Sequence, residues 1–368
     1  MRWLAFDHVG AVLTIAGVKA AIFAVGILLY PFATGHGLAM PLADLIEVTW
    51  NRWDALRFIG VAVNGYVNES IVFYPLYPLA IRAVAALVGD YFWAAFFIAN
   101  GASLIGLYLF YCLAEREFGR RVALYSLAAC LLFPTAYFFN APYAEGPFLL
   151  LTVGAFFSAR CRRWFLAGVL GGMAALTRVT GALLFPALVL EFVLQWREGS
   201  RDWLRALWLL FIPACFGTYL LLNAVAYGSP FAFMDFIRVH WDKSFAWPWV
   251  GLYRAGSVLY EQGLTVWSVF RGMGELAAGS LLALCTVWAF FRLRVSYALY
   301  LALVTFLVLS TTNLQSTPRY VVTAFPVFFL MGSLGGHYWL TLSWLILSIT
   351  LMTLFMTHYM HGSGIGGF

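Results

Sequence analysis

Charged side chains are scarce in this sequence of 368 residues. Asp, Glu, Lys and Arg together make up 10% of it, whereas soluble globular domains carry about 25%. Hydrophobic residues make up 63%, aromatic residues 18%, and the mean hydropathy is +0.86. This composition excludes a soluble domain. It indicates an all-α polytopic membrane protein, because most apolar runs approach the roughly 20 residues that cross a bilayer as a helix.

Other absences exclude several classes of function. The five cysteines form no CxxC pair and the six histidines are dispersed, so a zinc site has no support. Binding of Mg or Mn by carboxylates alone stays open. No Walker motif, dinucleotide fingerprint or GxSxG elbow lies in a suitable context, which leaves a nucleotide-sugar donor and serine hydrolysis unsupported. The net charge of +6 comes from short arginine clusters between apolar runs, so it does not indicate a nucleic-acid partner.

The arginine clusters predict how the chain crosses the membrane. They lie at 115–121, 160–163, 196–205 and 291–294, and we assign all four to the cytoplasm. With a cytoplasmic N-terminus, an odd number of crossings must then precede the first cluster. One apolar segment in that region is therefore not a full span. The segment 71–88 is short, opens with two prolines and carries Arg82, so we expect it to be a juxtamembrane helix.

The remaining apolar segments predict about eleven crossings in one integral-membrane domain covering residues 1–368. We expect these spans at 9–30, 92–113, 122–139, 147–159, 165–176, 181–194, 204–226, 276–291, 295–310, 321–334 and 338–359. Two large outer segments then remain, at about 31–91 and 227–271. Polar side chains gather in them, so we expect these segments to form a functional site.

A candidate general base lies in the first outer segment. Asp54 follows Trp53 and opens a stretch in which Phe58 and Val61 recur at helical spacing. A carboxylate held rigidly near the bilayer surface can accept a proton. Asp is also a preferred N-cap residue of helices. Spacing alone leaves both interpretations open.

Two arginines and one glutamate lie at the ends of other apolar segments. Arg319 and Tyr320 follow a proline, where the arginine can bind phosphate bidentately or serve as an interfacial anchor. Arg178 lies where two short apolar segments meet, so it is either a functional charge facing a polar cavity inside the membrane or an anchor at the outer interface. Glu145 opens another segment, where a carboxylate also suits the helix dipole.

Two further groups of polar residues have weaker signals. His240, Trp241 and Lys243 in the second outer segment offer an acid, a ring and a cation for a sugar phosphate, although such loop residues are more often only solvated. Lys19 lies inside the first span. A buried ammonium needs compensation, so we expect a structural pair with an acidic side chain.

Several motifs occur together in a characteristic order. They are Trp53-Asp54 followed by Phe58 and Gly65-Tyr66, the run FYPLYP at 73–78, NAPYAE at 140–145, TRVTG at 177–181, and Pro318-Arg319-Tyr320 with Phe325-Pro326. This order resembles the GT-C superfamily of polytopic glycosyltransferases and, within it, the PIG-V family of mannosyltransferases. Arg57 and Thr180 replace residues that are usual in the family pattern, which leaves the acceptor open.

The resemblance implies an inverting transferase with a polyprenyl-phosphate-linked sugar as donor, mannose being favoured, and a lipid, glycan or protein as acceptor. It implies Asp54 as the catalytic base. Arg319, Arg178 and Lys243 are expected to bind the donor phosphate. The other residues expected at the substrate are Arg52, Trp53, Arg57, Tyr74, Glu145, His240, Trp241 and Tyr320.

Two other functions stay open at this stage. One is a transporter or lipid flippase with Lys19 and Arg178 on its path, although the polar groups concentrate on one membrane face instead of the midplane. The other is a non-catalytic subunit of a glycosylation complex, which the Trp-Asp motif disfavours. The chain is short for the eukaryotic enzyme, so we expect the plasma membrane of a prokaryote rather than the endoplasmic reticulum. The site is expected on the non-cytoplasmic face.

Overall fold

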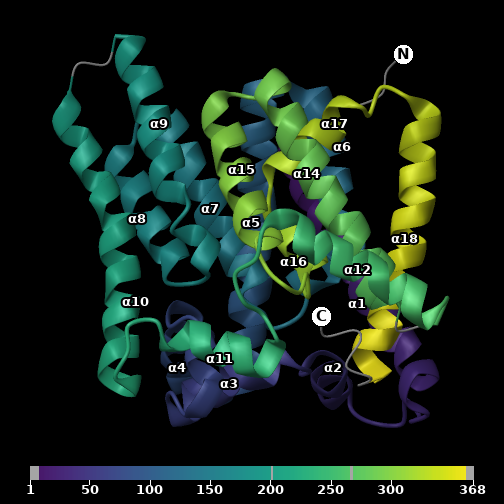
Figure 1. Ribbon diagram of the computed structural model, residues 1–368. Coiled ribbons are helices and arrows are strands. Elements are labelled where there is room, and N and C mark those ends of the chain that lie inside the picture. Colours follow the sequence, from purple (N-terminus) through teal and green to yellow (C-terminus); the bar gives the residue numbers. More distant parts are fainter. Residues whose placement is uncertain (1–7, 200–201, 266–267, 362–368) are drawn as a thin grey trace.

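The computed structural model describes residues 8–199, 202–265 and 268–361, which are predominantly helical (Figure 1). In chain order the elements are α1 (His8–Thr34), α2 (Leu42–Trp50), α3 (Asp54–Asn64), η1 (Asn68–Val72), α4 (Leu76–Val88), α5 (Tyr91–Phe118), α6 (Arg120–Leu131), η2 (Ala136–Phe139), α7 (Glu145–Arg160), α8 (Trp164–Ala175), η3 (Val179–Gly181), α9 (Leu184–Arg197), η4 (Trp203–Leu210), α10 (Phe211–Tyr227), α11 (Ala232–Trp241), α12 (Pro248–Gln262), the π-helix η5 (Val269–Gly274), α14 (Glu275–Arg292), α15 (Val295–Leu309), α16 (Thr317–Thr323), α17 (Pro326–Ser333) and α18 (Tyr338–His361). Within these ranges the structure contains no named strand, so the predicted all-α class is confirmed.

Six helical stretches are long and apolar enough to cross a membrane. They are His8–Thr34, Tyr91–Phe118, Val179–Arg197, Trp203–Tyr227, Val269–Arg292 and Tyr338–His361, and three shorter apolar helices accompany them. In each long stretch fewer than half of the residues in the most apolar 18-residue window are buried in the protein, so many apolar side chains face outward, where lipid can solvate them. The chain is a multi-pass integral membrane protein. The number of eleven crossings stays a prediction.

The four arginine clusters meet at one end of the bundle, as the topology required. Arg160, at the end of α7, bonds the carboxylates of Glu117 at 2.6 Å and Glu191 at 2.9 Å. Arg294 bonds the second oxygen of Glu191 at 2.7 Å and Glu198 at 3.0 Å. Glu191 is fully buried, so these pairs neutralise a charge that would otherwise be costly inside the bundle.

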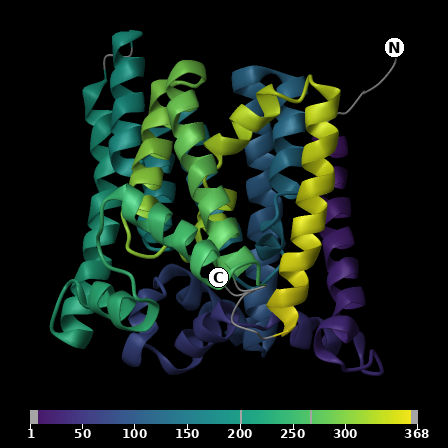
Figure 2. The same cartoon turned by 45° about the vertical axis from the view of Figure 1, so that its right-hand side comes forward.

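The opposite end of the molecule holds a layer of short helices. Helices α2, α3, α4 and α11 lie together there, below the upright helices in both views (Figures 1 and 2). The segment 71–88, expected as a juxtamembrane helix, supplies α4 of this layer. The last turn of α18 reaches the same end, where His361 Nδ1 lies 2.6 Å from the carbonyl of Ala33. The arginine network and the layer of short helices therefore mark opposite ends.

Two predicted spans are interrupted. The segment 122–139 is not one helix, because α6 ends at Leu131 and the chain resumes as the 3-10 helix η2. The segment 321–334 is divided into α16 and α17. Pro134 and Pro326 lie at these breaks, and proline lacks the N–H that continues a helix and disfavours helical geometry in the residue before it. Both breaks lie inside the protein, because residues 133–145 and 321–330 are buried.

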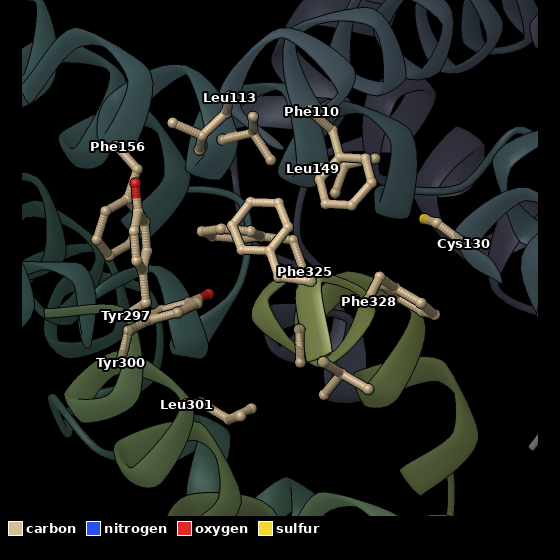
Figure 3. Close-up of a cluster of buried hydrophobic side chains, with 14 of the residues drawn as sticks. Phe110, Leu113, Cys130, Leu149, Phe156, Tyr297, Tyr300, Leu301, Phe325 and Phe328 are labelled. Atoms are coloured by element: carbon tan, nitrogen blue, oxygen red, sulfur yellow. The ribbon is translucent and has the colours of Figure 1, made fainter. Parts of the chain in front are cut away.

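The main hydrophobic core joins the central helices. Side chains from α5, α6, α7, α15 and α17 converge there (Figure 3). The rings of Phe110 and Phe329 stack at 5.2 Å, and Phe156 packs edge-on against Phe325 at 5.4 Å. This core holds α7 and the α16–α17 pair in fixed positions, and both carry charged residues at their outer ends.

A glycine sets the spacing between α5 and α7. A Cβ added at Gly106 would lie 2.8 Å from the backbone nitrogen of Leu150, closer than real Cβ contacts. We expect Gly106→Ala to destabilise the protein by about 1–3 kcal/mol through overpacking. On the same helix, Gly101 has open space around its Cβ position, so Gly101→Ala should be neutral or stabilising. Thermal unfolding in detergent measures both, and equal melting of the two variants would contradict this account of the packing.

Candidate active site

A cavity of about 190 Å3 lies where the bundle meets the layer of short helices. Its walls come from α3, the segment before α4, the residues before α7, the α8–η3 turn, α11 and the start of α16. The lining residues are Asp54, Phe58, Val72, Phe73, Tyr74, Ala144, Thr177, Arg178, Val179, Phe233, Ile237, Trp241, Lys243, Gln315, Ser316, Arg319 and Tyr320. Both outer segments expected to form a site contribute to it.

Asp54 is the first residue of α3 and faces this cavity. Its backbone N–H donates to the Tyr143 hydroxyl at 3.2 Å, and that hydroxyl donates to the carbonyl of Arg52 at 3.0 Å. The cap position belongs to Trp53, which has φ +55° and makes no side-chain cap bond. The N-cap interpretation of Asp54 is therefore wrong. Its carboxylate, 28% exposed, instead accepts a hydrogen bond from Arg319.

A chain of ion pairs joins three elements behind the cavity. Arg319 Nη1 lies 2.7 Å from Asp54 Oδ2, and its Nε and Nη2 lie 2.9 and 2.7 Å from Glu145 Oε1. Arg178 Nη1 lies 2.7 Å from the same Glu145 oxygen. Glu145 is fully buried. It holds two guanidinium groups at the cavity wall and offsets their mutual repulsion.

Aromatic rings fix the planes of the two guanidinium groups. The Arg319 guanidinium carbon lies 4.8 Å from the ring centre of Phe138 and 5.0 Å from that of Tyr143. That of Arg178 lies 4.9 Å from the ring centre of Tyr320. Guanidinium groups are attracted to aromatic faces, and the effect grows in a dry environment. The cations are therefore oriented before any ligand binds.

Lys243 supplies a third cation on the cavity wall. Its ammonium donates to the carbonyl of Gln315 and lies 6.0 Å from the ring centre of Tyr320. Burial lowers the pKa of the Lys243 ammonium, and nearby Arg271 and Arg319 act in the same direction, while Tyr320 and Glu275 oppose it. The lysine is therefore closer to losing its charge at alkaline pH than an exposed lysine is.

The lowered pKa of Lys243 has a measurable consequence. We expect the affinity for a phosphate-bearing ligand to fall as pH rises through this pKa, below the ordinary lysine value of about 10.4, because the neutral amine no longer attracts the anion. Lys243→Arg should keep the affinity at high pH. Ligand affinity measured from pH 7 to 10 tests this, and identical alkaline profiles for the two proteins would contradict it.

Aromatic rings also line this cavity. The ring of Tyr74 stacks on Tyr219 at 4.0 Å, with Phe233 edge-on at 6.5 Å. Trp241, at the end of α11, is half-buried beside Lys243. Such a cavity, lined by both aromatic rings and cations, suits a ligand with an uncharged ring and an anionic group.

The structure separates the predicted site residues into those that line the cavity and those that do not. Seven line the cavity, namely Asp54, Tyr74, Arg178, Trp241, Lys243, Arg319 and Tyr320. Glu145 lies directly behind them. The other four predicted residues also do not line it. Arg52 and Trp53 hold the turn before α3, with Arg52 Nε donating to Val48 and Trp53 Nε1 donating to Tyr359. Arg57 and His240 are exposed on α3 and α11.

Sequence reasoning missed one buried carboxylate near the cavity. Glu275 accepts hydrogen bonds from the backbone N–H groups of Ser316 and Thr317, both at 2.9 Å, and so fixes the turn that precedes Arg319. Its position at the start of an apolar span was the only signal. Ser316 has φ +74°, a conformation that needs such support.

The prediction that Lys19 pairs with an acidic side chain is wrong. The Lys19 ammonium donates to the carbonyl of Phe139 at 2.7 Å, to Ser103 Oγ at 2.8 Å and to Asn140 Oδ1 at 3.1 Å. Asn140 Nδ2 donates back to the carbonyl of Lys19 at 2.8 Å. The η2–α7 break exposes carbonyl oxygens that a lysine can satisfy, so no carboxylate is required. The lysine fastens α1 to the segment that precedes Glu145.

Removing this lysine should weaken the fold. We expect Lys19→Met to lower the free energy of unfolding by about 1–3 kcal/mol for each buried acceptor left without a donor. The unfolding midpoint of the purified protein in detergent measures the loss. A Lys19→Met protein that melts with the native one would show that the contacts to Phe139 and Asn140 contribute little.

Carboxylates do not gather into a metal site in the part of the chain that the structure describes. Within it, no group of three or more His, Cys, Asp or Glu side chains is placed to hold a metal ion.

Known proteins match this chain in sequence and in fold. A family model described as dolichyl-phosphate-mannose-protein mannosyltransferase matches residues 74–227. GPI mannosyltransferase 2 of Gibberella zeae is 31% identical over 128 residues, which cover 33% of this chain and 29% of that protein. The match thus spans less than a third of the relative's length.

One solved structure shares the overall arrangement of helices, and a second matches more distantly. ArnT from Cupriavidus metallidurans, crystallised with undecaprenyl phosphate, has a TM-score of 0.52 at 17% identity, covering 99% of this chain and 77% of that one. The oligosaccharyltransferase AglB from Archaeoglobus fulgidus, in complex with an inhibitory peptide and a dolichol-phosphate, has a TM-score of 0.44 at 10% identity, covering 96% and 56%. Together, the two sequence matches to mannosyltransferases and the ArnT-like fold confirm the predicted resemblance to the GT-C superfamily of polytopic glycosyltransferases.

Proposed function

We propose that this protein is an inverting glycosyltransferase that moves a sugar, mannose by resemblance, from a polyprenyl-phosphate donor to a hydroxyl of a lipid, glycan or protein. The observation that carries the proposal is the cavity in which Asp54 faces three cations, Arg178, Lys243 and Arg319. A base and an anion-binding wall within one small cavity are what such a reaction requires.

The proposed reaction uses Asp54 as the general base. The acceptor oxygen attacks the anomeric carbon as the bond from that carbon to the phosphate oxygen breaks. The hydroxyl proton passes to Asp54, and polyprenyl phosphate leaves as an anion. Arg319 holds Asp54 through Oδ2, so the second carboxylate oxygen can accept the proton. One displacement at the anomeric carbon inverts its configuration.

The cations stabilise the charge that develops on the leaving phosphate. Arg178 and Arg319 are oriented by Glu145 and by aromatic rings, so they need little rearrangement during the reaction. Preorganised charges of this kind contribute strongly when water is excluded. The ring of Tyr74 and the half-buried Trp241 provide apolar surface for the sugar.

The placement of the cavity supports a site on the non-cytoplasmic face. It lies at the end of the bundle opposite the arginine network, and arginine-rich connections favour the cytoplasm. Residues 31–91 and 227–271 both supply lining residues, which supports one domain with a site formed by these outer segments. A prokaryotic plasma membrane stays a prediction, and the relative with 31% identity is fungal.

The printed names of the matching proteins support the donor class. One family model names dolichyl-phosphate-mannose, one relative is a mannosyltransferase, and ArnT binds undecaprenyl phosphate. All three involve mannose or a long-chain lipid phosphate. The acceptor is left open, because these names point to different acceptors.

Release of the lipid phosphate tests the proposal against transport. Purified protein is incubated with polyprenyl-phosphate mannose and a membrane-lipid extract as the source of acceptor, and free polyprenyl phosphate is measured. A transferase cleaves the bond between the sugar and the phosphate, so polyprenyl phosphate should accumulate with the native protein and not with Asp54→Asn. A flippase moves the intact donor from one leaflet to the other. If the protein, reconstituted into vesicles, moves the donor across the bilayer and leaves it uncleaved, the proposal is overturned.

A further inference from the structure

A second cavity lies beside the first one and has a different lining. It measures about 200 Å3 and is enclosed by α12, η5 and the turn before α16. Its polar lining side chains are Arg254, Arg271 and Asn313. No carboxylate lines it among the residues that the structure describes. Its volume exceeds the roughly 30 Å3 that one water molecule occupies in the liquid, so it has room for a ligand group.

Close packing gives this cavity a fixed wall. A Cβ added at Gly272 would lie 3.0 Å from the carbonyl oxygen of Ala255, and one at Gly251 would lie 2.6 Å from that of Thr311. The helix α12 is therefore held tightly against η5 on one side and against the 311–316 turn on the other. Arg271 belongs to the π-helical segment Val269–Gly274, and such segments are frequent at functional sites.

The electrostatics of this cavity favour an anion. Arg254 is exposed and pairs with Asp242 at 2.8 Å, both side chains being more than half exposed. The Nε and Nη1 atoms of Arg271 are shielded from solvent. Both guanidinium groups line this small cavity, so an oxyanion placed in it is attracted by both. The carboxylate near Arg271 is that of Glu275, which does not line the cavity and accepts hydrogen bonds from the backbone N–H groups of Ser316 and Thr317. Planar guanidinium groups match the oxygens of phosphate particularly well.

The two cavities share one wall. Asn313 and Leu314 face the second cavity, while Gln315 and Ser316 face the first. In the segment after α11, Asp242 pairs with Arg254, which lines the second cavity. The next residue, Lys243, lines the first cavity. Only one turn of chain, residues 313–316, therefore separates the two cavities.

We propose that the second cavity is a phosphate-binding subsite, in which Arg254 and Arg271 hold a phosphate group of the acceptor beside the donor cavity. Its assignment to the acceptor rests on the proposed function, whereas the binding of phosphate does not. The subsite would select acceptors that carry a phosphate near the hydroxyl to be glycosylated, and it would leave the donor phosphate to Arg178, Lys243 and Arg319.

Inorganic phosphate is the probe that tests this subsite. Full-length protein in neutral detergent is saturated with polyprenyl phosphate, which occupies the first cavity, and its unfolding temperature is then measured against phosphate at constant ionic strength. The native protein should show a saturable rise. Arg254→Gln/Arg271→Gln should need at least about tenfold more phosphate, because it loses both charge-assisted bonds.

Matched variants keep this test decisive. Arg238→Gln removes an exposed arginine of α11, paired with Asp235, that lines neither cavity, so it should respond like the native protein. Arg254→Gln alone changes a surface residue and should give an intermediate response if the double variant does not fold. A native protein without saturable phosphate binding, or Arg254→Gln with the native response, would overturn the subsite.

Two further comparisons are needed. The first tells a failure of the proposed donor from a failure of the subsite, and the second tells whether the bound phosphate belongs to a lipid or to a soluble molecule. Stabilisation by polyprenyl phosphate alone reports on the first cavity, so its absence counts against the proposed donor and not against the subsite. In nanodiscs, phosphatidylglycerol is compared with phosphatidylcholine. Loss of the phosphate response with phosphatidylglycerol would identify a lipid headgroup as the ligand, and a response kept in both would identify a soluble phosphate group. Either result supports a phosphate subsite.

Discussion

Replacing Asp54 with asparagine is expected to reduce the rate of sugar transfer by about 100- to 10,000-fold, the usual contribution of a positioned general base. Asparagine keeps the size of the side chain and can still accept the hydrogen bond from Arg319, but it cannot take a proton at neutral pH. The loss should therefore appear in kcat, with the KM for the donor changed little. Initial rates at several donor concentrations separate the two constants.

The position of Asp54 makes this variant informative. Its carboxylate is partly exposed to the cavity, unlike the buried Glu145 behind it. Asp54→Asn should consequently fold and still bind polyprenyl phosphate. Arg57→Gln, on the exposed face of the same helix, provides the control and should keep the native rate. If Asp54→Asn transfers sugar as fast as Arg57→Gln, Asp54 is not the base.

Replacing Glu145 with glutamine should be the most damaging change to the fold near the site. Glu145 is fully buried and is the common partner of Arg178 and Arg319. Breaking a buried ion pair by removing one partner costs about 3–5 kcal/mol, because the remaining charges stay buried without compensation. We expect a large fall in the unfolding temperature of Glu145→Gln. Binding of polyprenyl phosphate should weaken as well, since the two arginines lose their orientation.

An exposed carboxylate provides the comparison for Glu145. Glu198 also bonds an arginine, Arg294, at 3.0 Å, but its side chain is 52% exposed. Solvent screens that pair, so Glu198→Gln should change the free energy of unfolding by no more than about 1 kcal/mol. Similar melting of Glu145→Gln and Glu198→Gln would show that Glu145 is not the central partner in the ion-pair chain.

The sequence predicted the class of fold and the ends of the bundle well. Composition and arginine clusters are averaged signals, so they survive errors at single boundaries. The clusters around Arg160 and Arg294 do meet at one end, joined through Glu191. The two broken spans were missed, because continuous apolar composition outweighed single prolines at 134 and 326.

Seven of the predicted site residues line the candidate cavity, but the sequence could not predict the contacts between them. Asp54 and Arg319 are 265 positions apart, and no local pattern relates two such residues. The order of the motifs, which resembles the family pattern, predicted that Asp54 and Arg319 lie at the substrate. It could not show that Glu145 joins Arg319 to Arg178. Periodicity also did not tell which side of α3 and α11 faces the cavity, so Arg57 and His240 were included although they are exposed.

The most direct test of the account is transfer of radiolabelled mannose from polyprenyl-phosphate mannose into membrane lipids and proteins, comparing the native chain with Asp54→Ala at matched folded amounts. The account predicts that a labelled product forms only with the native chain, as mannose is cleaved from the lipid phosphate. Equal labelling by both proteins would contradict the role of Asp54. If neither protein forms a labelled product and the polyprenyl-phosphate mannose stays uncleaved, this result would contradict the transfer of mannose.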